Sequence, residues 1–178
     1  MNKLAEKNTG RILDLLNERL TFERAGVKLY DAILERMRAS GDPQIQRMLG
    51  QMREHRNQEK EHEEWLEEQI RLLGGDAHTP SEKSILVQAE SQGIEHVIQR
   101  DPRIPHDFHA LLLAELADNA GWDLLVQLAD EFGDREAKKE FKKRLRHEAE
   151  HLLFVRRAVE QFAKQEMTGE PQRMPSGP

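Results

Sequence analysis

The placement of proline is the feature that most restricts how this chain can fold. All seven prolines border long stretches that contain none, at positions 43, 80, 102, 105, 171, 175 and 178. A proline inside a helix removes a backbone hydrogen bond and costs ~3 kcal/mol, so its confinement to junctions favours long uninterrupted helices. The stretches between the junctions predict helices over residues 9–39, 43–73, 105–132 and 134–167.

The composition agrees with helices that carry charge on their outer faces. Hydrophobic residues make up 37% of the chain and charged residues 34%, which is too polar for an average mixed α/β domain. An amphipathic helix gathers its apolar residues into one stripe that faces the core. We therefore expect a single all-α domain over residues 1–168, followed by a disordered tail over residues 169–178.

A long connection, residues 74–104, separates the first two predicted helices from the last two. Its apolar residues recur at helical spacing, which predicts one or two short helices within it: Ile85, Leu86, Ala89, Val97 and Ile98. A connection of this length returns the chain to its starting end, so that a second helical hairpin packs beside the first. The predicted architecture is a four-helix bundle of two hairpins.

Residue types that are missing exclude several classes of site and partner. Cysteine is absent, which excludes disulfides, thiolate zinc sites and cysteine-held iron–sulfur clusters. The net charge of −6 argues against nucleic acid or an anionic membrane as a partner. Neither a membrane-spanning apolar run nor an apolar leader segment is visible, so we expect a cytoplasmic protein.

A glutamate interrupts the apolar stripe of each long helix near its middle. In the second and fourth helices a histidine follows one turn later, and the set reads Glu23, Glu59-x-x-His62, Glu115 and Glu148-x-x-His151. Residues three apart on a helix project from one face. Four buried carboxylates at one level repel one another unless cations lie among them. Four carboxylates and two imidazoles suit two divalent iron or manganese ions in charge and in donor type.

The two hairpins carry this pattern as an internal repeat. Shifts of 92 residues for the first helix and 89 for the second superimpose equivalent residues: Glu23 on Glu115, Tyr30 on Trp122, Glu59 on Glu148 and His62 on His151. A repeat of this kind places equivalent side chains at equivalent heights. It predicts a site with pseudo-twofold symmetry between the hairpins.

In these residues the chain resembles the ferritin-like superfamily, above all its rubrerythrin-like and bacterioferritin-like four-helix domains. The resemblance covers residues 10–74 and 105–167 and includes the spacing of Glu23, Ala25 and Tyr30 in the first helix. It implies that the metal ligands are Glu23, Glu59, His62, Glu115, Glu148 and His151. It also implies that Glu59 and Glu148 bridge two ions, while Glu23 and Glu115 each bind one.

The same resemblance implies a function. It suggests two iron ions, or alternatively two manganese ions or one of each, that react with O₂ or hydrogen peroxide. We expect a peroxidase, ferroxidase or catalase-like oxidoreductase that is served by an unknown electron donor and forms a homodimer. Two alternatives stay open: a metal-binding or iron-storage protein, and a non-catalytic helical interaction module.

Other polar residues are candidates for the surroundings of the ligands. His55 lies one turn before Glu59 and is a possible extra ligand, proton carrier or packed core histidine. Its counterpart in the repeat is Arg144, which either balances carboxylate charge or reaches toward the end of the bundle. Tyr30 is a candidate hydrogen-bonding neighbour, although its counterpart Trp122 makes core packing the simpler interpretation.

A second group of candidates concerns the ring nitrogens of the ligand histidines that face away from the metal. A hydrogen bond to such a nitrogen fixes the tautomer of the ring. The sequence offers four residues near the right level for this role: Gln58, Asp118, Asn119 and His147.

Overall fold

The computed structural model describes residues 1–169, and every regular element in this range is a helix. The helices are α1 (Asn2–Ala39), α2 (Pro43–Leu72), α3 (Glu82–Arg100), α4 (Ile104–Glu131) and α5 (Arg135–Thr168). The all-α class predicted from the sequence is confirmed. None of these helices is apolar over a stretch long enough to cross a membrane.

The helix boundaries follow from side chains that satisfy the free backbone groups at helix ends. The Asp42 carboxylate accepts a hydrogen bond from the Gln44 amide, and Pro43 occupies the first helical position, where its missing N–H costs nothing. Ser81 and Ser84 form a reciprocal capping pair at the start of α3. Asp134 caps α5 in the same way by accepting from the Ala137 amide at 3.1 Å, whereas α1 and α4 begin without a side-chain cap.

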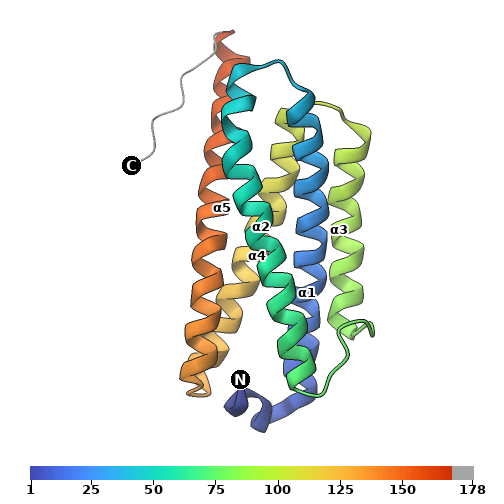
Figure 1. Ribbon diagram of the computed structural model, residues 1–178, viewed down its shortest axis with the longest axis vertical. Coiled ribbons are helices and arrows are strands. Elements are labelled where there is room, and N and C mark those ends of the chain that lie inside the picture. Colours follow the sequence, from blue (N-terminus) through green and yellow to red (C-terminus); the bar gives the residue numbers. More distant parts are fainter. Residues whose placement is uncertain (170–178) are drawn as a thin grey trace.

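Two helical hairpins, α1 with α2 and α4 with α5, pack against each other, and α3 lies on the outside of α1 (Figure 1). Helix α3 runs back along the molecule, so that α4 starts at the end where α1 finishes. Arg36 secures this junction, because its guanidinium donates to the Asp107 carboxylate at 2.6 Å and to the Asp101 carbonyl at 2.8 Å.

The buried apolar residues form two clusters at opposite ends of the bundle. The upper cluster in Figure 1 contains Met52 of α2 and Phe154 of α5, and the lower cluster contains Leu66 of α2 and Phe141 of α5. Along each of these helices the residues between the two clusters are those of the Glu-x-x-His pairs. The core is therefore divided by a polar layer at mid-height.

The connection holds one helix, α3, as predicted, but at 19 residues it is longer than expected. The first long helix was expected from residue 9, and the chain is indeed non-helical at Asn8, where φ is −165°, ψ is 91° and the side-chain oxygen accepts from the Arg11 amide at 3.1 Å. Before this kink α1 contains a further segment that starts at Asn2 and was not predicted. The extra turns are held by Asp134, whose carboxylate accepts from the amides of Lys3 and Leu4 at 3.0 and 3.3 Å. The tail predicted from residue 169 lies, after Gly169, outside the described residues.

Candidate metal centre

The six predicted ligands meet in the polar layer between the two apolar clusters. None of their side chains belongs to a residue that is more than 3% exposed, and they come from four different helices: Glu23, Glu59, His62, Glu115, Glu148 and His151. The sequence pattern placed them at one level, and the structure brings all six together.

Each histidine directs its Nδ1 atom toward carboxylate oxygens. The Nδ1 atom of His62 lies 2.9 Å from Glu148 Oε1 and 3.3 Å from Glu23 Oε2. The Nδ1 atom of His151 lies 3.0 Å from Glu59 Oε1, 3.3 Å from Glu148 Oε2 and 3.7 Å from Glu115 Oε2. Glu148 thus presents one oxygen to each histidine and lies between two adjacent groups of donors.

These two groups have the composition and size of metal sites. One contains Glu59, Glu115, Glu148 and His151, the other contains Glu23, His62 and Glu148, and within each group one donor atom per residue lies within 4.8 Å of the others. Carboxylate oxygens with a few imidazole nitrogens are donors that iron and manganese accept. The residues present therefore fit two neighbouring ions that share Glu148.

The inward-facing atoms of all six residues make no well-oriented hydrogen bond, although the two Nδ1 atoms lie 2.9 and 3.0 Å from carboxylate oxygens of the same set. These inward-facing atoms are Glu23 Oε2, Glu59 Oε1, His62 Nδ1, Glu115 Oε2, both carboxylate oxygens of Glu148, and His151 Nδ1. Buried polar atoms without partners are rare in folded proteins, because each costs the free energy of its lost hydration. Seven such atoms facing one another are what a site built for cations requires.

The outward-facing carboxylate oxygens of Glu23 and Glu115 are held by aromatic donors from the other hairpin. The Tyr30 hydroxyl on α1 donates to Glu115 Oε1 on α4 at 2.5 Å, and the Trp122 indole on α4 donates to Glu23 Oε1 on α1 at 2.7 Å. Tyr30 is fully buried, so it contributes to core packing as well. The repeat therefore relates two hydrogen bonds as well as two ligands.

The ligand histidines are held in the same crossed manner. His151 Nε2 lies 2.7 Å from Gln58 Oε1, and His62 Nε2 lies 3.0 Å from His147 Nδ1. Since the Gln58 oxygen can only accept, it fixes the proton of His151 on Nε2 and leaves Nδ1 free to bind a cation. Gln58 and His147, two of the four candidates for this role, occupy equivalent positions in the repeat.

Burial controls the charge of this layer in the absence of cations. It raises the pKa values of Glu59, Glu115 and Glu148 well above the usual range, and the neighbouring carboxylates add to the effect. Burial also lowers the pKa of His151, so its ring is neutral, the state in which imidazole binds metals. Without cations the carboxylates hold protons, and cations would displace them.

Asp118 does not hydrogen-bond a ligand histidine, contrary to one of the sequence-based suggestions. Its Oδ1 atom accepts from Arg19 Nη1 at 2.7 Å. A carboxylate oxygen of Asp118 also lies within 4.8 Å of oxygens of Glu23, Glu59 and Glu148. Burial raises the pKa of Asp118 to about 8, and the nearby Glu23 adds to this rise while Arg19 opposes it. A fifth carboxylate and a buried guanidinium thus complete the layer on one side.

Two glycines provide space for this arrangement. A Cβ atom at Gly26 would clash with the Glu59 carboxylate, and one at Gly121 would clash with the Arg19 guanidinium. The repeat relates Gly26 to Asp118, so that one hairpin has a carboxylate where the other leaves room for one. Arg19 was not among the candidates that the sequence pattern offered.

His55 and Arg144 add no donor to the two groups. His55 is buried with its ring centroid 4.3 Å from that of His151, and burial lowers its pKa to about 4. Arg144 stacks at 3.6 Å over the Trp65 ring and bonds to the carboxylate of Glu140 on its own helix. Asn119 is not hydrogen-bonded to a ligand histidine either. His55 and Arg144 pack beside the layer instead of entering it.

Comparison with known proteins does not identify the chain. No protein-family model, curated protein or solved structure matches it. Its function must therefore be argued from the arrangement of these side chains.

Proposed function

We propose that this protein is a ferritin-like dinuclear carboxylate protein that binds two iron ions, or two manganese ions or one of each, and reduces O₂ or hydrogen peroxide. The observation that carries the proposal is a cluster of seven possible ligand atoms from six buried residues, which face one another and make no well-oriented hydrogen bond. No other cause for burying four carboxylates and two imidazoles at one level is visible among residues 1–169. The two packed hairpins and the long return through α3 support the ferritin-like assignment.

The proposed roles of the residues follow from their contacts. Glu148, with one oxygen near each histidine, would be shared by both ions, and Glu23 and His62 would complete one site. Glu59, Glu115 and His151 would complete the other. Of the two histidines Glu59 approaches His151, and it also lies within 4.8 Å of Glu23 and Glu148, so it could bridge the ions as the resemblance implies.

The chain would control geometry, water and protons around the ions. Two ferrous ions, when bound, would supply the two electrons that convert hydrogen peroxide and two protons into two waters. Tyr30 and Trp122 hold the outer oxygens of Glu115 and Glu23, which fixes the direction of their inner oxygens. The apolar clusters above and below exclude bulk water from the layer. An external electron donor and a cytoplasmic location are part of the same proposal.

Metal quantification tests the site directly. Protein purified without chelator and loaded anaerobically with Fe²⁺ is expected to bind two ions per chain. The double variant Glu23→Ala/Glu115→Ala removes a ligand from each proposed site and should lose both ions while keeping its helical circular dichroism. The matched control, Glu64→Ala/Glu150→Ala, changes exposed glutamates on α2 and α5 and should keep both ions. Retention of two ions by the ligand variant would refute the site.

Oxidation kinetics test the chemistry. The ferrous protein is mixed anaerobically with hydrogen peroxide or with O₂, and the absorbance of the oxidised ions is followed. Faster oxidation by peroxide supports a peroxidase, and faster oxidation by O₂ supports a ferroxidase. A protein that holds two ions but is oxidised by neither would contradict the proposed reaction and favour a structural role of the metal.

A further inference from the structure

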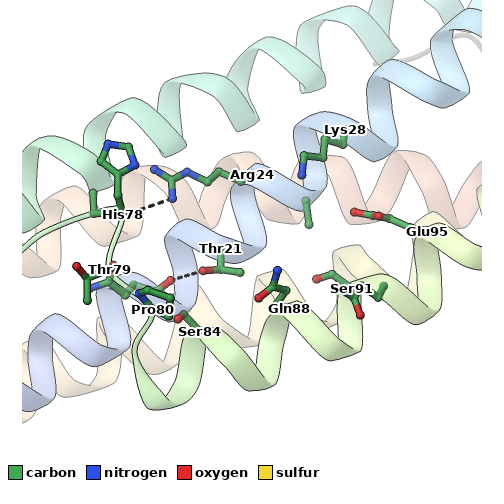
Figure 2. A pocket seen from close by; sticks show the side chains of 14 residues that line it. Thr21, Arg24, Lys28, His78, Thr79, Pro80, Ser84, Gln88, Ser91 and Glu95 are labelled. Atoms are coloured by element: carbon green, nitrogen blue, oxygen red, sulfur yellow. Dashed lines mark hydrogen bonds between the residues drawn. The ribbon is translucent and has the colours of Figure 1, made fainter.

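Helix α3 covers one outer face of α1. Figure 2 shows this contact as a polar pocket, with Thr21, Arg24 and Lys28 of α1 on one side and Gln88 and Ser91 of α3 on the other. The pocket also contains Ala25 of α1. The face of α1 that borders this pocket includes residues 21, 24, 25 and 28, one stripe at helical spacing, in which Ala25 is buried, Thr21 and Arg24 are half-buried and Lys28 is exposed.

The internal repeat relates this covered face to an uncovered face of α4. A shift of 92 residues superimposes the two stripes: Thr21 on Leu113, Arg24 on Leu116, Ala25 on Ala117 and Lys28 on Ala120. No helix of residues 1–169 lies over the stripe of α4, where Leu113 is 53% exposed and Leu116 43% exposed. The stripe of α1 is polar and partly buried beside α3, whereas the equivalent stripe of α4 is apolar and exposed to solvent.

The bare face of α4 lacks charge over four turns. Between Asp107 and Asp123 the charged residues of α4 are Glu115 and Asp118, and both are buried in the polar layer. The stripe continues past Ala120 to Leu124, which is 43% exposed. A contiguous apolar face without charges is a mark of a surface that a partner covers.

We propose that this face of α4 binds the same face of a second copy of this chain, with the two α4 helices antiparallel about a twofold axis between Ala117 and Ala120. A twofold interface requires that if residue i contacts residue j, then j also contacts i. The stripe satisfies this condition, because Leu113 would lie opposite Leu124 and Ala117 opposite Ala120. Large side chains then meet at the ends and small ones at the centre, where the helices approach most closely.

The polar residues at the ends of the stripe are also placed symmetrically. His106 near the start of α4 and Glu131 at its end are equally far from the proposed axis. The ring of His106 is already bonded through Nδ1 to Asp101 at 2.6 Å, so the match that favours a second copy is the symmetric order of leucines and alanines between these ends. An unrelated apolar partner would not require this match between the two halves of one helix.

The size of the stripe agrees with a modest but specific interface. From His106 to Glu131 the helix is about 37 Å long at ~1.5 Å per residue, and its face is about 10 Å wide. Two such faces, with their corrugated side chains, would bury on the order of 1,000 Å² in total, the lower end of specific interfaces. We therefore expect a dissociation constant on the order of micromolar.

Sedimentation velocity of the full chain over a concentration series tests the proposal. The wild type is expected to shift from one chain of 20.7 kDa to twice that mass as its concentration rises. Leu113→Lys and Leu124→Glu, each alone, place a charge opposite a leucine and should leave the protein monomeric. The double variant Leu113→Lys/Leu124→Glu places opposite charges across the axis twice and should restore the dimer. Leu86→Glu, at a 59% exposed leucine on α3, is the control and should remain dimeric.

Several outcomes would overturn this assignment. They are a monomeric wild type at every concentration, a particle larger than two chains, a single variant that still dimerises, and a double variant that stays monomeric. Circular dichroism of each variant verifies that it is folded. The result is independent of the proposed metal chemistry, because the substituted side chains point to solvent and the measurement requires no bound metal.

Discussion

Tyr30 on α1 and Glu115 on α4 are joined by a 2.5 Å hydrogen bond in a fully buried layer, with the phenol as the donor. Burial raises the pKa of Tyr30 well above 10, and the neighbouring carboxylate of Glu115 raises it further. The phenol therefore keeps its proton at any pH at which the protein works. It orients the carboxylate and does not serve as a base.

The titration of Tyr30 can be observed directly, because it is the only tyrosine in the chain. We expect no tyrosinate absorbance near 295 nm at pH 10, where a free tyrosine is half ionised. The signal should rise only when the protein unfolds in alkali, which circular dichroism would detect at the same pH. Half ionisation near pH 10 in the folded protein would contradict the buried hydrogen bond.

The ion pair between Arg19 and Asp118 predicts a pH-dependent effect of substitution. Arg19→Met removes the cation that opposes the raised pKa of Asp118, so the buried carboxyl takes up a proton and loses its hydrogen bond, which should lower the unfolding free energy by about 1–3 kcal/mol at pH 8. The loss should shrink at pH 5, where Asp118, with a pKa of about 8, is protonated. Urea unfolding of the metal-free protein measures both values.

A second substitution provides the control for Arg19. In Arg19→Met/Asp118→Asn the carboxyl that must take up a proton is gone, so most of the lost stability should return. If the two substitutions instead add without coupling, the guanidinium does not act through Asp118.

Gly26→Ala should separate metal binding from folding. The new methyl group overlaps the Glu59 carboxylate, so this ligand must move and the affinity for metal should fall. The metal-free protein should be as stable as the wild type or slightly more, because alanine is favoured over glycine in a helix by about 1 kcal/mol. Metal quantification and urea unfolding together test this.

The control for Gly26 is Gly50→Ala on α2, where an added Cβ atom would contact nothing. It should raise stability by a similar amount and leave metal binding unchanged. Wild-type metal affinity in Gly26→Ala would show that Glu59 does not depend on this space.

The stability of the metal-free protein should fall as the pH rises from 5 to 8. The pKa of Asp118 rises from 3.8 in the unfolded chain to about 8, and those of Glu59, Glu115 and Glu148 are also raised by burial. At these carboxyl groups the folded protein binds more protons than the unfolded chain. The lowered pKa values of His55, His147 and His151 oppose this near pH 5 to 6.5, so the fall in stability should be steepest between pH 7 and 8. Each extra proton lowers the unfolding free energy by about 1.4 kcal/mol per pH unit.

Bound metal should remove this trend. Cations displace the protons, so the affinity for metal rises with pH and adds stability where the metal-free protein loses it. Urea unfolding at several pH values, with chelator and with Fe²⁺ under anaerobic conditions, measures both curves. A metal-free protein that becomes more stable from pH 5 to pH 8 would contradict the raised pKa values.

The sequence predicted which six residues meet in the buried polar layer, because they violate the rule that the apolar stripe of a helix carries no charge. Glu23 and Glu115 stand out in stripes of leucine and phenylalanine, and the repeat fixes their common height. Arg19 gave no such signal, since its counterpart in the repeat is Leu111 and a charged residue in an amphipathic helix usually faces water. Its burial depends on the space at Gly121, which is a tertiary contact.

The segment of α1 before Asn8 and the full length of α3 were not predicted, and both depend on residues far away in the sequence. The turns before Asn8 are stabilised by Asp134, which is more than 120 positions away in the chain. Helix α3 buries few of its own side chains, so its sequence pattern alone predicts little of its length. It packs against α1 through a small set of buried residues: Ser84, Val87, Ser91 and Ile98. Local patterns carry neither kind of information.

The two halves of the repeat differ around the candidate metal centre, and this difference would affect the order in which two ions bind. Gly26 and Asp118 occupy equivalent positions, as do Gln58 and His147, yet the members of each pair differ in charge or in hydrogen bonding. The two halves share their candidate ligands but differ in the residues around them, so the two proposed ion sites are unequal. The first ion would therefore bind at the site of higher affinity. The second ion would then bind beside it, at a site whose charge the first ion had already changed.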